Sequence, residues 1–269
     1  MADTEELAKG YTLVNDTQYK AGLYLLQKLS ITPGLPIHIL DIGCGPGNLT
    51  SHIASLISPH GTIIGIDPSR ERIALALSNY PSTIHENSNI SFHVGKAEDL
   101  SMFESASFDI VFVNSTFHWI SDQITALGEF ARVLKTGGKL GISGGSGDYI
   151  AIHERIKADV LSRDPYSKYP EETPPKFVKR CEMEKMLEVA GFQRRDVDIS
   201  VNRIVKEAKD AEGMLDWLDS SSSGKTYGGV PVELRGRVRE EMLEEWRKVA
   251  TEEGIRMEME LLVTVAVKG

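Results

Sequence analysis

Two kinds of hydrophobic pattern alternate along the first half of the chain. Short runs of β-branched and apolar residues predict buried strands at 37–42, 62–67, 90–94, 108–114 and 139–143. Between them, apolar residues recur at helical spacing and predict helices at 17–29, 47–57, 69–79 and 121–134. This succession of strand and helix is typical of an α/β protein, in which helices cover both faces of a mostly parallel sheet.

The alternation lapses after about residue 145. Glycines 144, 145 and 147 predict a flexible joint, followed by a helix and a proline-rich loop. A helix at 181–190 and a sixth strand at about 194–204 restore the pattern, and a last strand is expected at 257–267.

The domain organisation follows from these interruptions. We expect one domain over 1–269, with an N-terminal cover at 1–30 and a small helical lid formed by insertions at about 146–180 and 206–254. In the second insertion, an amphipathic helix from Val232 to about Glu252 keeps its apolar residues on one face, which favours a core role for them.

The first predicted strand ends in three glycines at alternate positions, in the sequence Leu40-Asp41-Ile42-Gly43-Cys44-Gly45-Pro46-Gly47. Glycine allows a positive φ and a close approach of the backbone to a ligand. The second strand ends in Asp67, where an acid can accept hydrogen bonds from both hydroxyls of a ribose. The pattern predicts a pocket for a nucleoside-bearing cofactor at the carboxyl ends of the strands. A tight turn without a ligand is the alternative.

The glycine spacing differs from the dinucleotide-binding fingerprint, because the third glycine comes one residue early. The segment instead resembles the first motif of class I S-adenosylmethionine-dependent methyltransferases. The resemblance implies a Rossmann-like, seven-stranded mixed sheet in the order 3-2-1-4-5-7-6, whose last strand lies antiparallel between strands five and six. It also implies S-adenosyl-L-methionine as the cofactor.

The same resemblance implies a set of cofactor-binding residues. These are Tyr11, Gln18, Asp41, Gly43, Cys44, Gly45, Asn48, Asp67, Pro68, Ala97, Glu98, Asn114 and Ser115. Tyr11 and Gln18 match residues that close over the cofactor in the trans-aconitate and juvenile-hormone-acid methyltransferases; a surface tyrosine and a solvated glutamine are the alternative. Lys96 is a departure, since the family usually has an acid there to accept the adenine amine. The base would then be bound by the Ala97 N–H and by Glu98 or Asp99.

The fourth predicted strand ends in Asn114-Ser115-Thr116-Phe117-His118-Trp119, where family members bring the acceptor to the methyl group. The segment lacks the prolines of nucleic-acid and glutamine methyltransferases and resembles the small-metabolite branch. We expect His118, Trp119, Tyr149 and Trp217 to bind the substrate. His118 is the candidate catalytic residue, because an imidazole can remove a proton from a phenol, amine or thiol near neutral pH. A structural histidine is the alternative.

Composition limits the partners. The net charge of −9 makes nucleic acid a poor partner, and the longest apolar runs are too short to cross a membrane. The acidic start lacks the pattern of a signal peptide. Two distant cysteines and the absence of metal-ligand spacing indicate reduced thiols, no metal site and a cytoplasmic protein, monomeric or homodimeric.

These observations lead to one functional expectation and two rivals. We expect methyl transfer from S-adenosylmethionine to a small organic acceptor, with a carboxylate or another oxygen nucleophile favoured and sulfur or nitrogen possible. The first rival is a protein or RNA methyltransferase. The second is a cofactor-binding protein that has lost methyl transfer.

Overall fold

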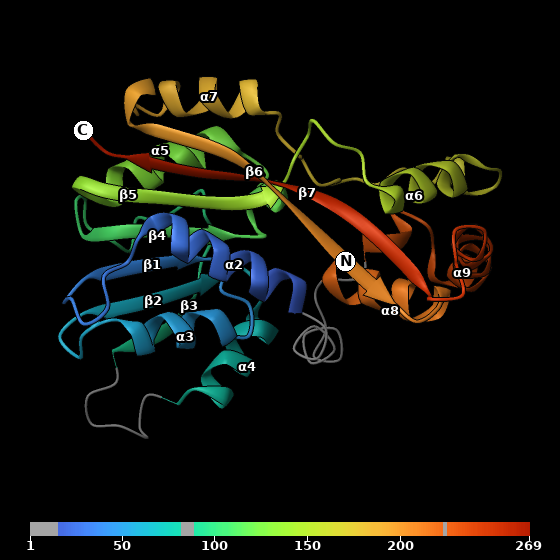
Figure 1. Ribbon diagram of the computed structural model, residues 1–269, viewed down its shortest axis with the longest axis horizontal. Helices are drawn as coiled ribbons and strands as arrows, with labels where there is room; N and C mark the ends of the chain where they lie inside the picture. Colours follow the sequence, from blue (N-terminus) through green and yellow to red (C-terminus); the bar gives the residue numbers. More distant parts are fainter. Residues whose placement is uncertain (1–15, 82–88, 223–224) are drawn as a thin grey trace. The chain divides into compact units, whose positions relative to one another are not determined.

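The computed structural model describes residues 16–81, 89–222 and 225–269. Its strands form a seven-stranded sheet in the order β3-β2-β1-β4-β5-β7-β6 (Figure 1). The strands are β1 (His38–Ile42), β2 (Thr62–Asp67), β3 (Ile90–Val94), β4 (Phe108–Asn114), β5 (Leu134–Gly145), β6 (Val197–Ala208) and β7 (Ile255–Val267). Neighbours among the first five strands pair in parallel, and β7 pairs antiparallel with β5. The order implied by the resemblance is confirmed.

Contact clustering divides the chain into two compact units. The larger, which we call the core unit, comprises Gln18–Asp148, Lys176–Asn202 and Leu261–Gly269. Among the described residues, the smaller, the appended unit, comprises 16–17, 149–175, 203–222 and 225–260. The last three of these ranges overlap the two insertions expected from the sequence.

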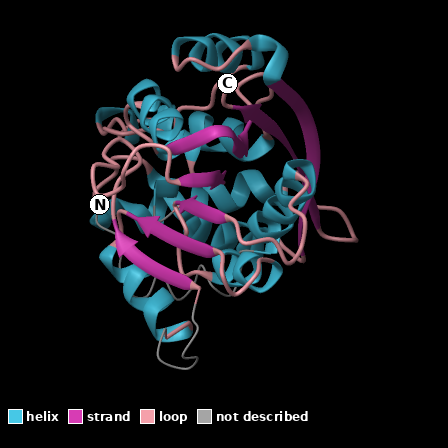
Figure 2. Ribbon diagram, turned by 90° about the vertical axis from the view of Figure 1, so that its left-hand side faces the viewer, coloured by secondary structure: helices cyan, strands magenta, loops and turns pink. Residues whose placement is uncertain are grey.

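Helices lie on both sides of the sheet in the core unit (Figure 2). They are α2 (Asp16–Leu29), α3 (Asn48–Leu56), α4 (Arg70–Asn79), α5 (Gln123–Val133) and α7 (Arg180–Val189), with short 3₁₀ turns η1 (Phe117–Trp119) and η3 (Arg194–Asp196). Side chains alternate across a strand, so consecutive residues of β1 face different helices. Leu40 and Ile42 join the cluster that contains α5, whereas Asp41 accepts a hydrogen bond from Thr50 of α3.

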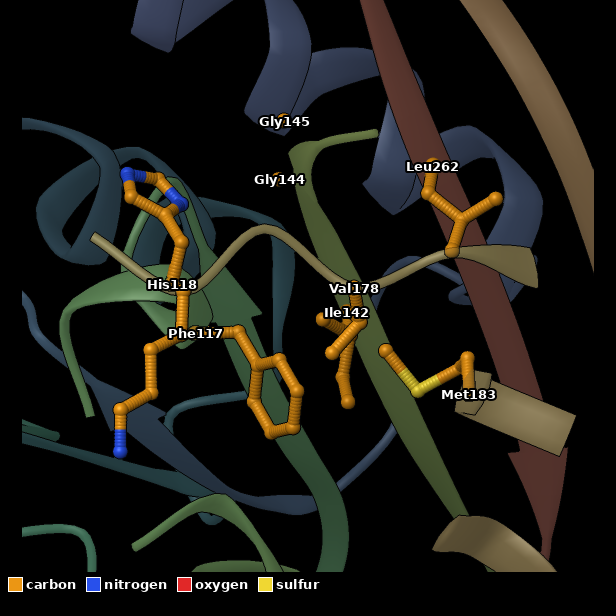
Figure 3. Close-up of a pocket in the computed structure, with 9 residues that line it drawn as sticks. Phe117, His118, Ile142, Gly144, Gly145, Val178, Met183 and Leu262 are labelled. Carbon is orange, nitrogen blue, oxygen red and sulfur yellow. The ribbon is translucent and has the colours of Figure 1, made fainter. Parts of the chain in front are cut away.

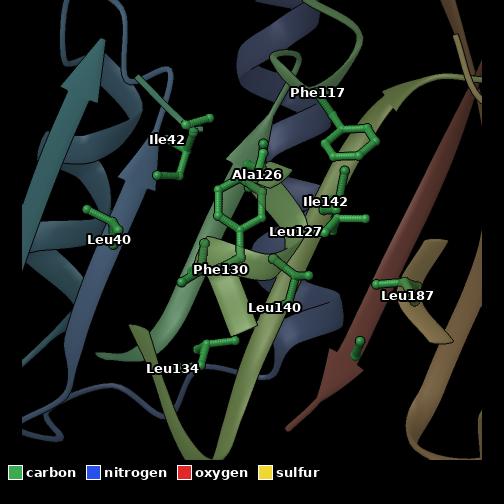
Figure 4. Packing of buried hydrophobic residues seen from close by; sticks show 14 of the residues in the cluster. Leu40, Ile42, Phe117, Ala126, Leu127, Phe130, Leu134, Leu140, Ile142 and Leu187 are labelled. Atoms are coloured by element: carbon green, nitrogen blue, oxygen red, sulfur yellow. The ribbon is translucent and has the colours of Figure 1, made fainter. Parts of the chain in front are cut away.

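The main hydrophobic cluster fills the space between α5, α7 and the central strands (Figure 4). Phe130 and Leu127 of α5 are fully buried there against residues of β1, β4 and β5 such as Leu140. Parallel strands that are buried on both faces need nearly continuous apolar sequence, which is why 108–113 and 62–66 were recognisable as strands. The result is a rigid sheet whose carboxyl ends position the loops.

The structure differs from the predicted boundaries where α5 meets β5. The sequence predicts that the helix ends at a glycine pair and that a strand begins at 139. Instead β5 begins at Leu134, which pairs with Phe108, and the register shifts before Lys139 pairs with Ile110. Gly137, at φ 77°, lies inside this irregular segment. The glycines therefore accommodate a bulge in the strand and do not end the helix.

The appended unit has its own hydrophobic core. Its helices are α6 (Ile152–Ser162), α8 (Ala211–Ser221) and α9 (Val232–Arg247), with 3₁₀ turns η2 (Tyr166–Lys168) and η4 (Lys225–Tyr227). Trp246 and Met242 of α9 are buried, which agrees with the core role predicted for that face, although α9 ends earlier than residue 252. Arg163, directly after α6, is paired with Glu241 and Glu245 of α9 at 3.2 and 2.6 Å.

Within residues 16–81, 89–222 and 225–269, none of the helices combines the length and apolar character needed to span a bilayer.

Candidate functional site

The glycine turn after β1 is held against the end of β2. The N–H groups of Gly43 and Cys44 both donate to the carbonyl oxygen of Ile66, at 2.7 and 3.0 Å. Gly43, Gly45 and Gly47 have φ angles of 73°, 56° and 86°, in the region that favours glycine. Helix α3 begins directly after Gly47. The turn thus leads into a helix N-terminus, as the sequence predicts.

Gly43 also allows the end of β4 to approach the turn. A Cβ atom at Gly43 would lie 2.1 Å from Oγ1 of Thr116, which leaves no room for a side chain. Thr116 donates a hydrogen bond to the carbonyl oxygen of Asn114 at 3.0 Å. Sequence analysis did not select Thr116. Thr116 lies two residues after the end of the predicted fourth strand, and this position was the signal in the sequence that could have identified it.

Asp67 joins the end of β2 to the glycine turn. Its side chain is 6% exposed; Oδ2 accepts the Gly45 N–H at 3.0 Å, and Oδ1 accepts the Ser69 N–H at 2.8 Å. Each carboxylate oxygen can accept more than one hydrogen bond, and a carboxylate at the end of this strand is suited to a ribose. Its neighbour Pro68 is exposed.

Asp41 lies beneath the same turn and is fully buried. Oδ2 accepts a hydrogen bond from Oγ1 of Thr50 at 2.7 Å. Burial raises the pKa of Asp41 to about 7, and the charge of Asp67 adds to that rise. Burial and both aspartates also raise the pKa of the Cys44 thiol well above its usual range. Cys44 is therefore a neutral, packed side chain. Thr50, like Thr116, was not predicted.

Three buried acceptors around the turn have no hydrogen-bond partner among the described residues. They are Gln18 Oε1, Asn48 Oδ1 and Asn114 Oδ1. Asn114 Nδ2 donates to the main-chain oxygen of Gln18 at 2.9 Å, so α2 and the end of β4 are in contact. Buried oxygens without donors cost free energy unless a ligand or water supplies N–H or O–H groups. An ammonium group and hydroxyls, as in the predicted cofactor, fit this need.

The loop after β3 was predicted to bind the adenine. Ala97 is buried, but both neighbouring acids have main-chain partners: Glu98 accepts the Ser121 N–H at 3.0 Å and Asp99 accepts the Ser101 N–H at 3.1 Å. Glu129 and Arg132 of α5 hold the same loop through the N–H and carbonyl oxygen of Leu100. This arrangement favours a main-chain contact at Ala97 over a side-chain contact from Glu98.

Residues 114–119, which we call the acceptor turn, follow β4. Ser115 has φ 54° and donates its N–H to the Ser143 carbonyl oxygen at 2.7 Å. The His118 ring lies 4.9 Å from the Phe177 ring and 5.0 Å from that of Trp119, measured between centroids. A cavity of about 10 Å³, lined by His118, Phe117 and Met183 among others, lies beside the ring (Figure 3). It has room for about one water molecule.

The structure changes the chemistry expected of His118. Its Nδ1 is buried with no partner among the described residues, and burial lowers the pKa of His118 to about 3. The ring is therefore neutral at neutral pH and is a weaker base than the sequence analysis assumed. It can donate or accept one hydrogen bond, but it is poorly suited to removing a proton from an amine or an unactivated hydroxyl.

The remaining predicted residues belong to the appended unit or fall outside the described residues. Tyr11 falls outside the described residues. Tyr149 and Trp217 belong to the appended unit. Trp217 is 5% exposed and packs in the core of that unit, with Nζ of Lys206 5.5 Å from its ring, so it has a packing role that the substrate-binding prediction did not include. No group of three or more metal-ligating side chains occurs in the described segments.

Comparison with known proteins agrees with this geometry. A family model described as a methyltransferase domain matches residues 40–142, which hold the glycine turn, Asp67 and the acceptor turn. An O-methyltransferase of Pyrenophora dematioidea is 33% identical over 224 residues, which cover 80% of this chain and 74% of that protein. The chain belongs to the class I S-adenosylmethionine-dependent methyltransferases.

Other relatives match this methyltransferase over shorter regions. The O-methyltransferase cnsE of Penicillium expansum is 32% identical over 64% of this chain and 58% of its own length. A trans-aconitate 2-methyltransferase of Afipia carboxidovorans is 35% identical over 39% of this chain and 37% of its own length. Among solved structures, the YcgJ protein of Bacillus subtilis has a TM-score of 0.65 at 16% identity, over 93% of this chain and 98% of that one, and shares the fold.

Removal of the Asp67 carboxylate should weaken cofactor binding. Loss of charge-assisted hydrogen bonds to a ribose costs about 2–4 kcal/mol. We expect Asp67→Ala to raise the Kd for S-adenosylhomocysteine at least tenfold in calorimetry, and Asp67→Asn to fall between it and the wild type. Asp198→Ala, at an exposed carboxylate paired with Lys28, is the control. Unchanged affinity in a folded Asp67→Ala variant would remove Asp67 from the site.

The raised pKa of Asp41 should make cofactor affinity depend on pH. Below its pKa of about 7 the carboxyl is protonated, and above that pH it is ionised and attracts a positively charged ligand. If binding requires the ionised form, the Kd for S-adenosylmethionine should be roughly tenfold higher at pH 6 than at pH 8. Calorimetry at both pH values should show this change of Kd with pH in the wild type and a smaller change in Asp41→Asn. An equal change of Kd with pH in both proteins would contradict the assignment of Asp41 to the cofactor site.

Proposed function

We propose that this protein transfers a methyl group from S-adenosylmethionine to a small organic acceptor, with an oxygen nucleophile favoured. One observation carries the proposal: the glycine turn and Asp67 lie at the carboxyl ends of β1 and β2, with three buried acceptors nearby that have no partner in the described part of the chain. Such a place, outside the carboxyl ends of neighbouring strands, is where α/β proteins bind nucleotide-like ligands.

Each part of the proposed site has a distinct task. When bound, S-adenosylmethionine supplies a methyl group activated by a sulfonium, which passes in line to the acceptor and leaves S-adenosylhomocysteine. Asp67 would accept from the ribose hydroxyls, and the Ala97 main chain would contact the adenine. Gln18, Asn48 and Asn114 would accept hydrogen bonds from the polar groups at the methionine end of the cofactor. Asp41 would balance the positive charge of the cofactor. The turn of Gly43, Cys44 and Gly45 gives the backbone room to approach.

The acceptor turn supports the preference for oxygen. Since His118 is neutral and weakly basic, it can orient an acceptor by one hydrogen bond more readily than it can deprotonate one. That favours acceptors that are already anionic or easily ionised, such as carboxylates, enols and phenols. The names of the relatives from Pyrenophora dematioidea and Penicillium expansum, both O-methyltransferases, point the same way. Sulfur and nitrogen acceptors remain the lesser alternatives.

The partners proposed here are small molecules. The net charge of −9 disfavours a nucleic-acid acceptor, and a monomer or homodimer stays our prediction for the assembly. The same acidity also argues against the rival RNA methyltransferase.

The proposal is tested by direct assay with S-adenosylmethionine labelled in its methyl group. The purified protein is incubated with separate pools of carboxylic acids, phenols, thiols and amines, and labelled product is identified by mass spectrometry. We expect label on oxygen in the acid or phenol pool, and at least a tenfold loss of rate in Asp67→Ala at subsaturating cofactor. Tight cofactor binding without transfer to any pool would favour the rival in which methyl transfer is lost.

We further propose that the N-terminal segment and the two insertions act as a lid over the site. Glycines 144, 145, 147, 228 and 229 border the insertions and can serve as hinges. Amides in residues 8–20 should gain hydrogen-exchange protection when cofactor binds, and those in 148–170 and 217–229 should gain more when an acceptor joins. Equal exchange in the free, binary and ternary states would leave these segments as ordinary surface structure.

A further inference from the structure

Gln123 is buried although its side chain is an amide. It is the first residue of α5 and is 8% exposed. Its Nε2 donates hydrogen bonds to the main-chain oxygens of Phe117 at 3.0 Å and Lys176 at 2.9 Å, which uses both of its protons. The helix does not need this amide as a cap, because Asp122 accepts the Thr125 N–H at 3.0 Å. The amide instead links two segments that are 59 residues apart in the sequence, from Phe117 to Lys176.

The second of these segments, residues 176–178, runs beside the acceptor turn, and we call it the strap. The Lys176 N–H donates to the His118 carbonyl oxygen at 2.7 Å, and Nζ of Lys176 donates to the Ser121 carbonyl oxygen at 2.6 Å. The Phe177 ring packs on the His118 ring at an interplanar angle of 32°. Val178 is fixed in turn, since its carbonyl oxygen accepts the Gly147 N–H at 2.8 Å. The strap therefore holds both the main chain and the ring of His118.

The His118 ring depends on these contacts for its orientation. No described residue bonds to its Nδ1, and a Cβ atom at Gly144 would come within 3.3 Å of that nitrogen. With no hydrogen bond to fix this edge, the ring is held by stacking on Phe177 and Trp119 and by the main chain on which it is mounted. If the link between the turn and the strap is broken, the ring loses the partner that keeps it in one orientation.

We propose that Gln123 is a positioning residue of the acceptor site, whose amide joins the acceptor turn to the strap so that His118 presents one fixed edge to the acceptor. The inference rests on the proposed function only in placing the acceptor at this turn. Alignment of reacting groups is sensitive to small displacements, so a tilted ring beside the acceptor lowers the rate of transfer even when the cofactor is bound normally.

The test uses the full chain with nitrogen-15 in its histidines. In Gln123→Met both hydrogen bonds are lost with little change in side-chain length. Gln123→Glu keeps the shape and, when ionised, replaces the donor by a carboxylate. Gln27→Met, at an exposed glutamine of α2, is the matched control. The His118 ring signals are assigned with His118→Asn. Nuclear Overhauser contacts between the rings of His118 and Phe177 are then measured, with S-adenosylhomocysteine affinity recorded by calorimetry.

We expect the wild type and the control to show strong contacts between the two rings. Both Gln123 variants should shift the His118 ring signals and weaken those contacts at least twofold, while the Kd for S-adenosylhomocysteine changes less than twofold. If His118 signals and ring contacts are unchanged in a folded variant whose melting temperature has dropped, Gln123 is a packing residue and the proposal is wrong. If one variant does not fold, the other decides.

A second measurement connects the geometry to the reaction. With an acceptor found in the pooled assay, Gln123→Met should lower kcat at least tenfold at saturating cofactor and leave the cofactor KM within twofold. An unchanged kcat would overturn the positioning role even if the ring moves. If no pool contains an acceptor, the proposed function fails on its own, and the ring contacts still decide what Gln123 does.

Discussion

The turn after β1 has no space for a side chain at Gly43, and much of the core unit is arranged around that restriction. The turn must lie within contact of Thr116 at the end of β4 while its N–H groups bond to Ile66 at the end of β2. A Cβ atom there would collide with Thr116 and separate the end of β4 from the turn, which follows the end of β1 and is bonded to the end of β2. Because those ends carry Asp41, Asp67 and Asn114, the close approach at one glycine decides whether the proposed cofactor residues face a common space.

The same edge of the sheet gives the site its electrostatic character. Two aspartates lie close enough for the charge of Asp67 to raise the pKa of Asp41, and a positively charged ligand relieves the repulsion between them. The other end of the proposed site is different, since His118 is uncharged and packed between aromatic rings. The site thus combines a charged half, suited to a polar cofactor, with an apolar half, suited to an organic acceptor.

Sequence patterns predicted what local physics determines. The strands at 62–67 and 108–114 were predicted at their observed bounds because buried parallel strands need nearly unbroken apolar runs, and 90–94 was predicted at its bounds from a weak alternation of apolar and polar residues. Asp67 and the glycines could be selected because their positions relative to strand ends carry the chemistry. The contacts that give Thr116 and Gln123 their roles could not be predicted, since their partners Gly43 and Lys176 lie 73 and 53 residues away. The low pKa of His118 was equally out of reach, because it follows from burial and not from residue type.

The position of β7 has a consequence for how the chain is made. Of the seven strands in this sheet it is synthesised last, yet it lies between β5 and β6. During synthesis, the 12 residues of β6 emerge well before their neighbour in the sheet exists, and the appended unit cannot complete its core until Trp246 and Met257 have followed. The nascent chain therefore carries an open sheet edge and exposed apolar surface until β7 has left the ribosome, which makes completion of the sheet dependent on this strand.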